Sequence, residues 1–236
     1  MEKLSKNMGK VASLVVIGVI LLPLVGIVAA SNLSTAVIIM GIGVCMLFVA
    51  SPKYSHFVII VILGVAFVTV FIMFAGYRGD RIQAFLHPET AGDKGYQTLM
   101  GLYAIGSGGL FGKGLGKSLQ KLGYIPESQN DMIFSVICEE LGLFGAFCLI
   151  ALFIVMLWRI NHIAQNAPDL FGSMLATGVF AHIAIQVILN IAVVTNTIPN
   201  TGVSLPFISY GGTAAVFLLL ELGVVFNISS QIKLER

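Results

Sequence analysis

The chain alternates long apolar stretches with shorter polar segments. Six stretches are long enough to cross a bilayer as helices, which takes about 17–25 residues. They lie near residues 11–30, 34–50, 57–76, 133–158, 171–194 and 208–230. Helices are the expected form, because lipid offers backbone N–H and C=O groups no hydrogen-bond partners. The pattern therefore predicts an all-α polytopic membrane protein with about six transmembrane helices.

Composition agrees with this prediction. Of the 236 residues, 57% are hydrophobic and 10% are charged, and the mean hydropathy is +0.97. An average soluble domain carries about 25% charged residues. The net charge of +2 gives no reason to expect nucleic acid as a partner. Cys45, Cys138 and Cys148 lie in or beside apolar runs, so we interpret them as packing residues and not as a disulfide framework.

Lysines and arginines predict the orientation. Seven of them lie in the N-terminus and in the other short segments on the same side of the membrane. The other six lie in one long loop on the opposite side, residues 77–132. Because the positive-inside rule applies to short segments and not to long translocated ones, we expect both termini in the cytoplasm and this loop outside. A cleaved signal peptide also fits the first run, but its apolar body exceeds the usual 7–15 residues or so and a second span follows at once.

This orientation divides the chain into three parts. Residues 1–76 hold a basic segment and three spans, and residues 77–132 form the large extracellular loop. Residues 133–236 hold three more spans, an extracellular Pro/Gly loop at 195–209 and a cytoplasmic C-terminus. Within the large loop, residues 77–96 are expected to be extended, with turns at His87-Pro88 and at Gly92-Asp93.

The second half of the large loop is amphipathic and broken by glycines. Its GKGLGKS segment resembles the end of a phosphate-binding loop, but that motif needs glycine where Phe111 stands. We therefore reject nucleotide binding. Lys113, Lys117 and Lys121 recur every four residues and would form one positive stripe on a helix. Such a stripe fits binding of a lipid-linked phosphate, and it also fits a solvated surface facing lipid headgroups.

Two carboxylates stand four residues apart where the large loop meets the fourth apolar run, Glu127 and Asp131. Pro126 suits the first turn of a helix, and a helix starting there would bring both near one face with Glu139. A carboxylate that loses water has a raised pKa and is a better proton acceptor. Helix capping explains Glu127 equally well, whereas Asp131, directly before three apolar residues, favours function. Glu139 and Glu140 are expected to pair with loop cations or to stabilise the fold.

Polar residues also occur inside the last two spans. His182, Gln186 and Asn190 recur at four-residue spacing, and Glu221 lies in the sixth run. Such residues usually face the helix bundle or a cavity, where they form interhelical hydrogen bonds or serve a pathway. Between these spans, NTIPNTGVSLPFISYGGT (residues 196–213) predicts irregular backbone that lines a protein cavity.

Two long motifs, GYIPESQNDMIFSVICEELG and IPNTGVSLPFISYGG, closely resemble the SEDS family (shape, elongation, division and sporulation). RIQAFLHPE, GYQTLMGLYAIGSGGLFGKGLGKSLQK and ASNLSTAVI support the resemblance, which covers essentially the whole chain. The division-type members are the most similar, with elongation and sporulation types as alternatives. The family fold has ten spans, so the chain resembles its C-terminal part. Where many members read P-D-L-G-T, this chain has Asn32, which cannot ionise.

The resemblance implies a peptidoglycan glycosyltransferase that polymerises lipid II for septal cell-wall synthesis. Its essential aspartate maps onto Asp131, the expected base for the acceptor hydroxyl, with Glu127 secondary. The candidate substrate-binding residues are Lys113, Lys117, Lys121, Ser209, Gly211 and Gly212. A divalent cation, Mg or Mn, could share the pyrophosphate charge, although no ligand cluster in the sequence identifies a metal site.

The expected location is the bacterial cell membrane at the division septum. The expected partners are lipid II, a class B penicillin-binding transpeptidase, other division proteins and the membrane, without nucleic acid. Two other functions stay open. The polar positions in the spans, including Glu221, also suit a transporter or flippase for lipid-linked precursors. A transporter should hold its charges near the midplane, whereas the densest chemistry here lies in the outer loop. A scaffold for division partners is the third reading.

Overall fold

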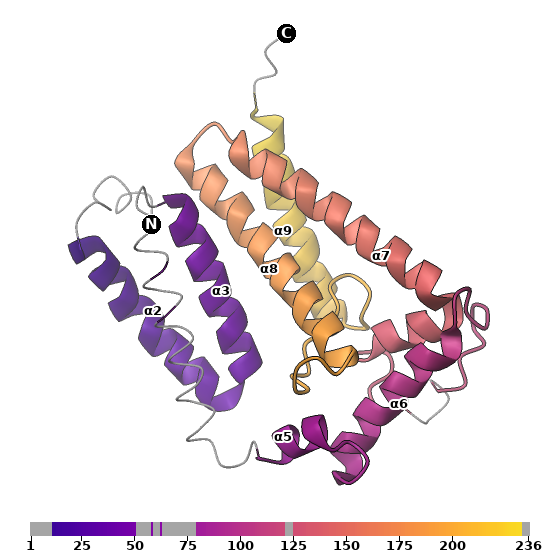
Figure 1. Ribbon diagram of the computed structural model, residues 1–236. Coiled ribbons are helices and arrows are strands. Elements are labelled where there is room, and N and C mark those ends of the chain that lie inside the picture. Colours follow the sequence, from indigo (N-terminus) through magenta and orange to yellow (C-terminus); the bar gives the residue numbers. More distant parts are fainter. Residues whose placement is uncertain (1–10, 51–57, 59–61, 63–78, 121–124, 233–236) are drawn as a thin grey trace. The chain divides into compact units, whose positions relative to one another are not determined.

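The computed structural model describes residues 11–50, 58, 62, 79–120 and 125–232 (Figure 1). Within these ranges every regular element is a helix. The helices are α2 (Val11–Ser31), α3 (Leu33–Ala50), α5 (Gly79–Leu86), α6 (Gly92–Gly108), α7 (Ile133–Gln165), α8 (Leu170–Val194) and α9 (Gly212–Ser230). The basic N-terminus, Lys121 and, apart from residues 58 and 62, the third predicted span lie outside the described residues.

Five helices coincide with predicted apolar runs. α2, α3, α8 and α9 match them within four residues at each end, and α7 extends seven residues beyond residue 158. Of the described helices, α3, α7, α8 and α9 are long and apolar enough to cross a membrane. Large apolar side chains such as Phe147 and Phe226 remain 68% and 67% exposed on them, as expected for surfaces that contact lipid. The prediction of an all-helical polytopic membrane protein is confirmed.

The chain forms two compact units, and the first comprises residues 1–74, 156–185 and 217–236. In this unit α2 and α3 lie side by side (Figure 1) and pack through Val25, Ala29 and Ala36. Asn32 lies at the turn between them, and its Oδ1 accepts a hydrogen bond from the Thr35 N–H (3.2 Å). The Asn32 side chain therefore caps α3.

A polar contact joins α8 to α9 in the same unit. Nδ1 of His182 lies 2.9 Å from both carboxylate oxygens of Glu221. The side chains are 25% and 30% exposed. His182 and Glu221, two of the polar residues inside the predicted spans, thus face each other. This supports their interpretation as an interhelical contact.

The second unit comprises residues 75–155 and 186–216. Its first described element is α5, so the prediction that this stretch is extended is wrong for the residues described. Ile82, Phe85 and Leu86 have helical spacing, and this short apolar stripe outweighs the turn signals nearby. The turn at His87-Pro88 is confirmed: the Thr90 N–H donates to the His87 carbonyl (3.1 Å). α6 follows, and its last residue, Gly108, begins the glycine loop, defined here as residues 108–120.

Helix α7 is broken at Gly142, where φ is 70° and ψ is −170°. In a regular helix the N–H groups of Leu143 and Phe144 would bond the carbonyls of Glu139 and Glu140. Instead they donate to the carbonyls of Gly109 and Leu110 (2.9 and 3.0 Å). The two freed glutamate carbonyls accept from the N–H groups of Lys113 and Gly114, each at 2.9 Å. The glycine loop thus exchanges four backbone hydrogen bonds with the break.

Candidate active site

The acidic motif lies in a turn and not in a helix. Residues 125–132 are a series of turns, and α7 begins only at Ile133. Glu127 has a left-handed backbone with φ of 55°, and its side chain is exposed and accepts a hydrogen bond from Asn130. The prediction that Glu127, Asp131 and Glu139 share one helical face is therefore wrong. The three carboxylates lie in three different environments.

Three consecutive carbonyls attach this turn to α8 and to the segment that follows it. The carbonyl of Gln129 accepts from the Tyr210 N–H at 2.8 Å, and that of Asn130 accepts from Ser209 Oγ at 2.7 Å. The carbonyl of Asp131 accepts from Asn190 Nδ2 at 2.7 Å. Because these contacts involve the backbone carbonyls, they fix the path of the turn without occupying the Asp131 carboxyl.

The Asp131 side chain is buried but not satisfied. The residue is 8% exposed, and its Oδ1 accepts no hydrogen bond from any described residue. Desolvation raises the pKa of this carboxyl, and the nearby charge of Glu127 raises it further against opposing backbone hydrogen bonds. The predicted burial of this carboxylate, and the direction of its pKa, are confirmed. A partly dehydrated carboxylate with one oxygen unpaired is suited to accept a proton.

Asp131 lines a pocket of about 250 Å³. The other lining residues are Ala84, Phe85, Gln97, Thr98, Asn200 and Gly202. Asn200 Nδ2 donates to Gln97 Oε1 (3.2 Å), and Gln97 Nε2 donates to the Pro126 carbonyl (3.4 Å). The pocket thus combines one carboxylate with amide and hydroxyl groups, which is the chemistry that binds sugar hydroxyls.

Sequence reasoning missed the two amide residues of this pocket. Gln97 lies on α6, far in sequence from Asn200 and Asp131, so no local pattern places them together. Asn200 lies in the irregular Pro/Gly segment that was predicted to line a cavity. That prediction was the sequence feature that could have identified Asn200 as a pocket residue. Asn190, in contrast, was recognised as polar and is fully buried with a second bond to the Val203 carbonyl (2.8 Å).

The glycine loop is not a helix, so the predicted stripe of Lys113, Lys117 and Lys121 does not form on one. Helix α6 ends at Gly108, and Gly109, Gly112, Gly114 and Gly116 all have positive φ, a conformation incompatible with a continuing helix. Lys117 is exposed, and Lys121 lies outside the described residues.

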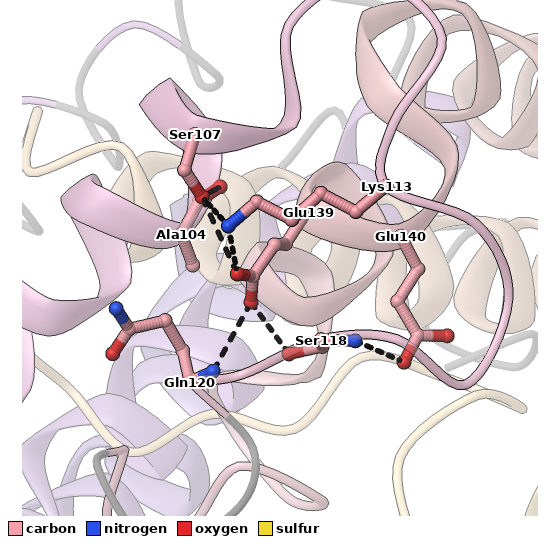
Figure 2. Close-up of polar contacts among 7 residues, drawn as sticks. All are labelled: Ala104, Ser107, Lys113, Ser118, Gln120, Glu139 and Glu140. Carbon is pink, nitrogen blue, oxygen red and sulfur yellow. Dashed lines mark hydrogen bonds and ion pairs between the residues drawn. The ribbon is translucent and has the colours of Figure 1, made fainter.

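Two adjacent carboxylates hold the glycine loop (Figure 2). Glu139 is fully buried and accepts from Lys113 Nζ (2.7 Å), Ser107 Oγ (3.3 Å), Ser118 Oγ (2.5 Å) and the Gln120 N–H (3.3 Å). Glu140 accepts from the N–H groups of Gly116 and Ser118 (2.9 and 3.3 Å). The prediction that these glutamates pair with loop cations or stabilise the fold is confirmed: Glu139 pairs with Lys113, and Glu140 binds the loop backbone. Donors that resemble those of a phosphate-binding loop thus serve carboxylates of the same chain.

The remaining predicted site residues lie in or after the Pro/Gly segment. Ser209 Oγ accepts from the Leu205 N–H (2.7 Å) while donating to Asn130. Gly211 is half-buried and Gly212 is exposed at the start of α9. Over the described residues, no three His, Cys, Asp or Glu side chains converge as metal ligands. A role for these residues in binding substrate, and any metal requirement, stay predictions.

The sequence is similar to those of a known protein family. A family model described as cell cycle protein, covering FtsW, RodA and SpoVE, matches residues 2–234. "Stage V sporulation protein E" from Bacillus subtilis is 43% identical over 214 residues, which cover 90% of this chain and 58% of that protein. "Probable peptidoglycan glycosyltransferase FtsW" from Trichlorobacter lovleyi is 38% identical over 218 residues, covering 92% and 57%. The chain thus spans a little over half the length of these relatives.

Solved structures agree on the fold. A structure described as "Structural coordination of polymerization and crosslinking by a peptidoglycan synthase complex" matches with a TM-score of 0.77 at 23% identity, covering 98% of this chain and 67% of the other. The crystal structure of the rod shape determining protein RodA from Thermus thermophilus matches with a TM-score of 0.65 at 23% identity, covering 98% and 63%. At this identity the likeness concerns the fold alone.

Proposed function

Because the chain belongs to the FtsW/RodA/SpoVE family of cell cycle proteins, we propose that it acts as a peptidoglycan glycosyltransferase that polymerises lipid II. The observation that carries the proposal is the carboxyl of Asp131. It is buried, its Oδ1 has no partner among the described residues, and it lines a pocket with amide groups. These are properties of a general base beside a carbohydrate.

In the proposed step, the Asp131 carboxylate takes the proton of the acceptor sugar's 4-hydroxyl. The oxygen then forms a bond to the anomeric carbon of the donor, and the bond from that carbon to the lipid pyrophosphate breaks. The pyrophosphate leaves with the electron pair, so positive charge near it lowers the barrier. Glu127 is assigned a secondary role, because it is exposed and acts on Asp131 through its charge.

We assign the leaving group to Lys117 and Lys121, with Ser209, Gly211 and Gly212 as further substrate contacts. Lys113 is the weaker candidate, because its Nζ lies 2.7 Å from Glu139 and is already neutralised there. A divalent cation, Mg or Mn, remains a proposed addition to this charge. The chain's own part in the step is to hold the base, the amides and these cations.

The division septum is the proposed place of action, in the cell membrane with residues 77–132 facing outside. The FtsW relatives support this role, and the sporulation relative supports a second candidate, synthesis at a sporulation septum. The structure of a complex that couples polymerization to crosslinking supports a class B penicillin-binding transpeptidase as the partner. Expression in place of the division gene or the sporulation gene of Bacillus subtilis would separate the two roles.

The test of the activity is glycan-chain formation from purified lipid II in vesicles, with and without the cognate transpeptidase. The 236-residue chain and the same chain fused to four upstream spans of a relative are each compared with Asp131→Asn. Glu89→Gln is the matched control, because Glu89 is an exposed carboxylate of the same loop. Polymer that disappears only with Asp131→Asn supports the enzyme and its base, and normal polymer from folded Asp131→Asn contradicts the assignment.

The same vesicles test the transport alternative, which the paired His182 and Glu221 inside the spans keep open. Movement of fluorescent lipid II between leaflets without polymer would replace the enzyme by a transporter. In that case His182→Ala would abolish the movement and Asp131→Asn would leave it unchanged.

A further inference from the structure

The glycine loop exposes large apolar side chains outside any helix. Leu110, Phe111, Leu115 and Leu119 are 65%, 80%, 76% and 59% exposed. Burying such side chains away from water is favourable, so four of them within ten residues form a strongly apolar surface. Patches of this kind on a protein surface usually contact a membrane or another protein.

The apolar side chains continue a surface that faces lipid. The ring of Phe111 contacts that of Phe144 on α7, with 6.5 Å between their centroids. Phe144 and Phe147 are 63% and 68% exposed, and they belong to a helix long and apolar enough to cross a membrane. Because the exposed face of such a helix contacts lipid, the exposed face of Phe111 beside it is expected to contact lipid as well.

The backbone of the loop is built for surroundings without water. From Gly112 to Gln120, seven of the nine N–H groups donate to acceptors of the chain itself. Three of these seven bonds go to the carboxylates of Glu139 and Glu140. A loop in water can use water for this purpose, whereas irregular backbone at membrane depth must find its partners within the protein.

The charges of the loop are also compatible with lipid. Lys113 is paired with the buried carboxylate of Glu139, so its charge is neutralised locally. Lys117 is exposed, and a lysine at the membrane surface places its apolar stem in lipid and its ammonium among the headgroups.

We propose that residues 109–119 form a re-entrant loop that inserts into one leaflet of the bilayer, with Leu110, Phe111, Leu115 and Leu119 among the acyl chains. Glu139 and Glu140 then satisfy its backbone in place of water. This inference concerns the placement of the loop and does not depend on the proposed enzymatic activity.

Tryptophan fluorescence tests the proposal directly, because Trp158 is the only tryptophan of the chain. In a Trp158→Phe background, Phe111→Trp is reconstituted into phosphatidylcholine vesicles with or without brominated acyl chains. Leu115→Trp provides a second probe if the first variant does not fold. Phe147→Trp is the lipid-exposed control, and N-acetyltryptophanamide in the buffer is the control for water.

Insertion predicts that brominated lipid quenches the Phe111→Trp or Leu115→Trp emission at least twofold, as it does for Phe147→Trp, and that acrylamide in the buffer quenches it several-fold less than the soluble amide. Efficient acrylamide quenching with no effect of brominated lipid would overturn the proposal. Protection from both quenchers only after a protein partner is added would assign the surface to that partner instead.

Discussion

Asn190, a residue of the apolar helix α8, donates a hydrogen bond to the backbone carbonyl of Asp131, with 2.7 Å between Nδ2 and O. The same Nδ2 lies 2.8 Å from the carbonyl of Val203. One buried amide therefore connects the acidic turn to the Pro/Gly segment. A membrane helix thus sets the position of the proposed base without touching its carboxyl.

Replacing Asn190 tests this connection. Asn190→Ala leaves two buried carbonyls without a donor, and each unsatisfied group costs about 1–3 kcal/mol. We expect a clear loss of thermal stability in detergent or nanodiscs, together with lower polymerisation by the protein that remains folded. Asn227→Ala is the control, because Asn227 is an exposed asparagine of α9. Equal melting temperatures for the two variants would contradict the structural role of Asn190.

The raised pKa of Asp131 predicts a shifted acidic limb for polymerisation. The base acts only when ionised, so the rate falls as the pH drops through a pKa above the usual value of about 3.9. Glu127→Gln removes a negative charge that raises this pKa, so the midpoint of the limb moves to lower pH. The pH dependence of kcat/KM measures it, with Glu89→Gln as control. A shift towards higher pH would contradict the electrostatic coupling.

Asp131→Asn is predicted to stabilise the protein while abolishing activity. Because burial raises the pKa of the folded state, the ionised carboxylate costs stability at pH values above that pKa. At pH 7 we expect the amide variant to melt a few degrees higher than the unchanged chain. The difference shrinks as the pH falls through the raised pKa, since the carboxyl then becomes neutral. A lower melting temperature at pH 7 would show that the carboxylate is stabilised by its surroundings.

Gly142→Ala tests the break in α7. An added Cβ would lie 2.3 Å from the Gly112 nitrogen and 2.5 Å from the Leu110 oxygen, at a φ of 70°. Backbone strain alone costs about 1–3 kcal/mol, so a large drop in melting temperature is expected. Gly106→Ala in α6 is the matched control, because nothing lies within 4 Å of its Cβ position. This control should gain about 0.5–1 kcal/mol of stability; a similar result for Gly142→Ala would place the break elsewhere.

Residue pattern predicted the helices well because a membrane span is a local property. Runs of apolar residues set the bounds of α2, α3, α8 and α9 within four residues. The break at Gly142 was not predicted, because the apolar run continues through it and its partners, Gly109 to Gly114, lie about thirty residues away. The lysine spacing predicted a helix because the lysines recur every four residues. The glycines between them adopt positive φ, which prevents a helix and is not visible in the spacing.

The candidate site was also predictable only where it depends on local sequence. The burial of Asp131 was predictable, because three large apolar residues follow it directly in the sequence and favour a position away from water. Its pocket was not, because Gln97 and Asn200 meet only in the folded chain. Glu139 and Glu140 were assigned to the fold correctly, but their partners, the N–H groups of Gly116, Ser118 and Gln120, carry no mark in the sequence.

The exchange of four backbone bonds between the glycine loop and the break in α7 restricts how this region can vary. Each of the bonded carbonyls and N–H groups has a fixed position in the chain, from Gly109 to Gly114 on one side and from Glu139 to Phe144 on the other. Inserting or deleting a single residue on either side would displace every bond that follows it. Side chains such as Leu115 can be replaced by other apolar residues, but the number of residues between the bonded groups cannot change. In natural variants of this chain, length between these points is therefore expected to be kept more strictly than residue identity.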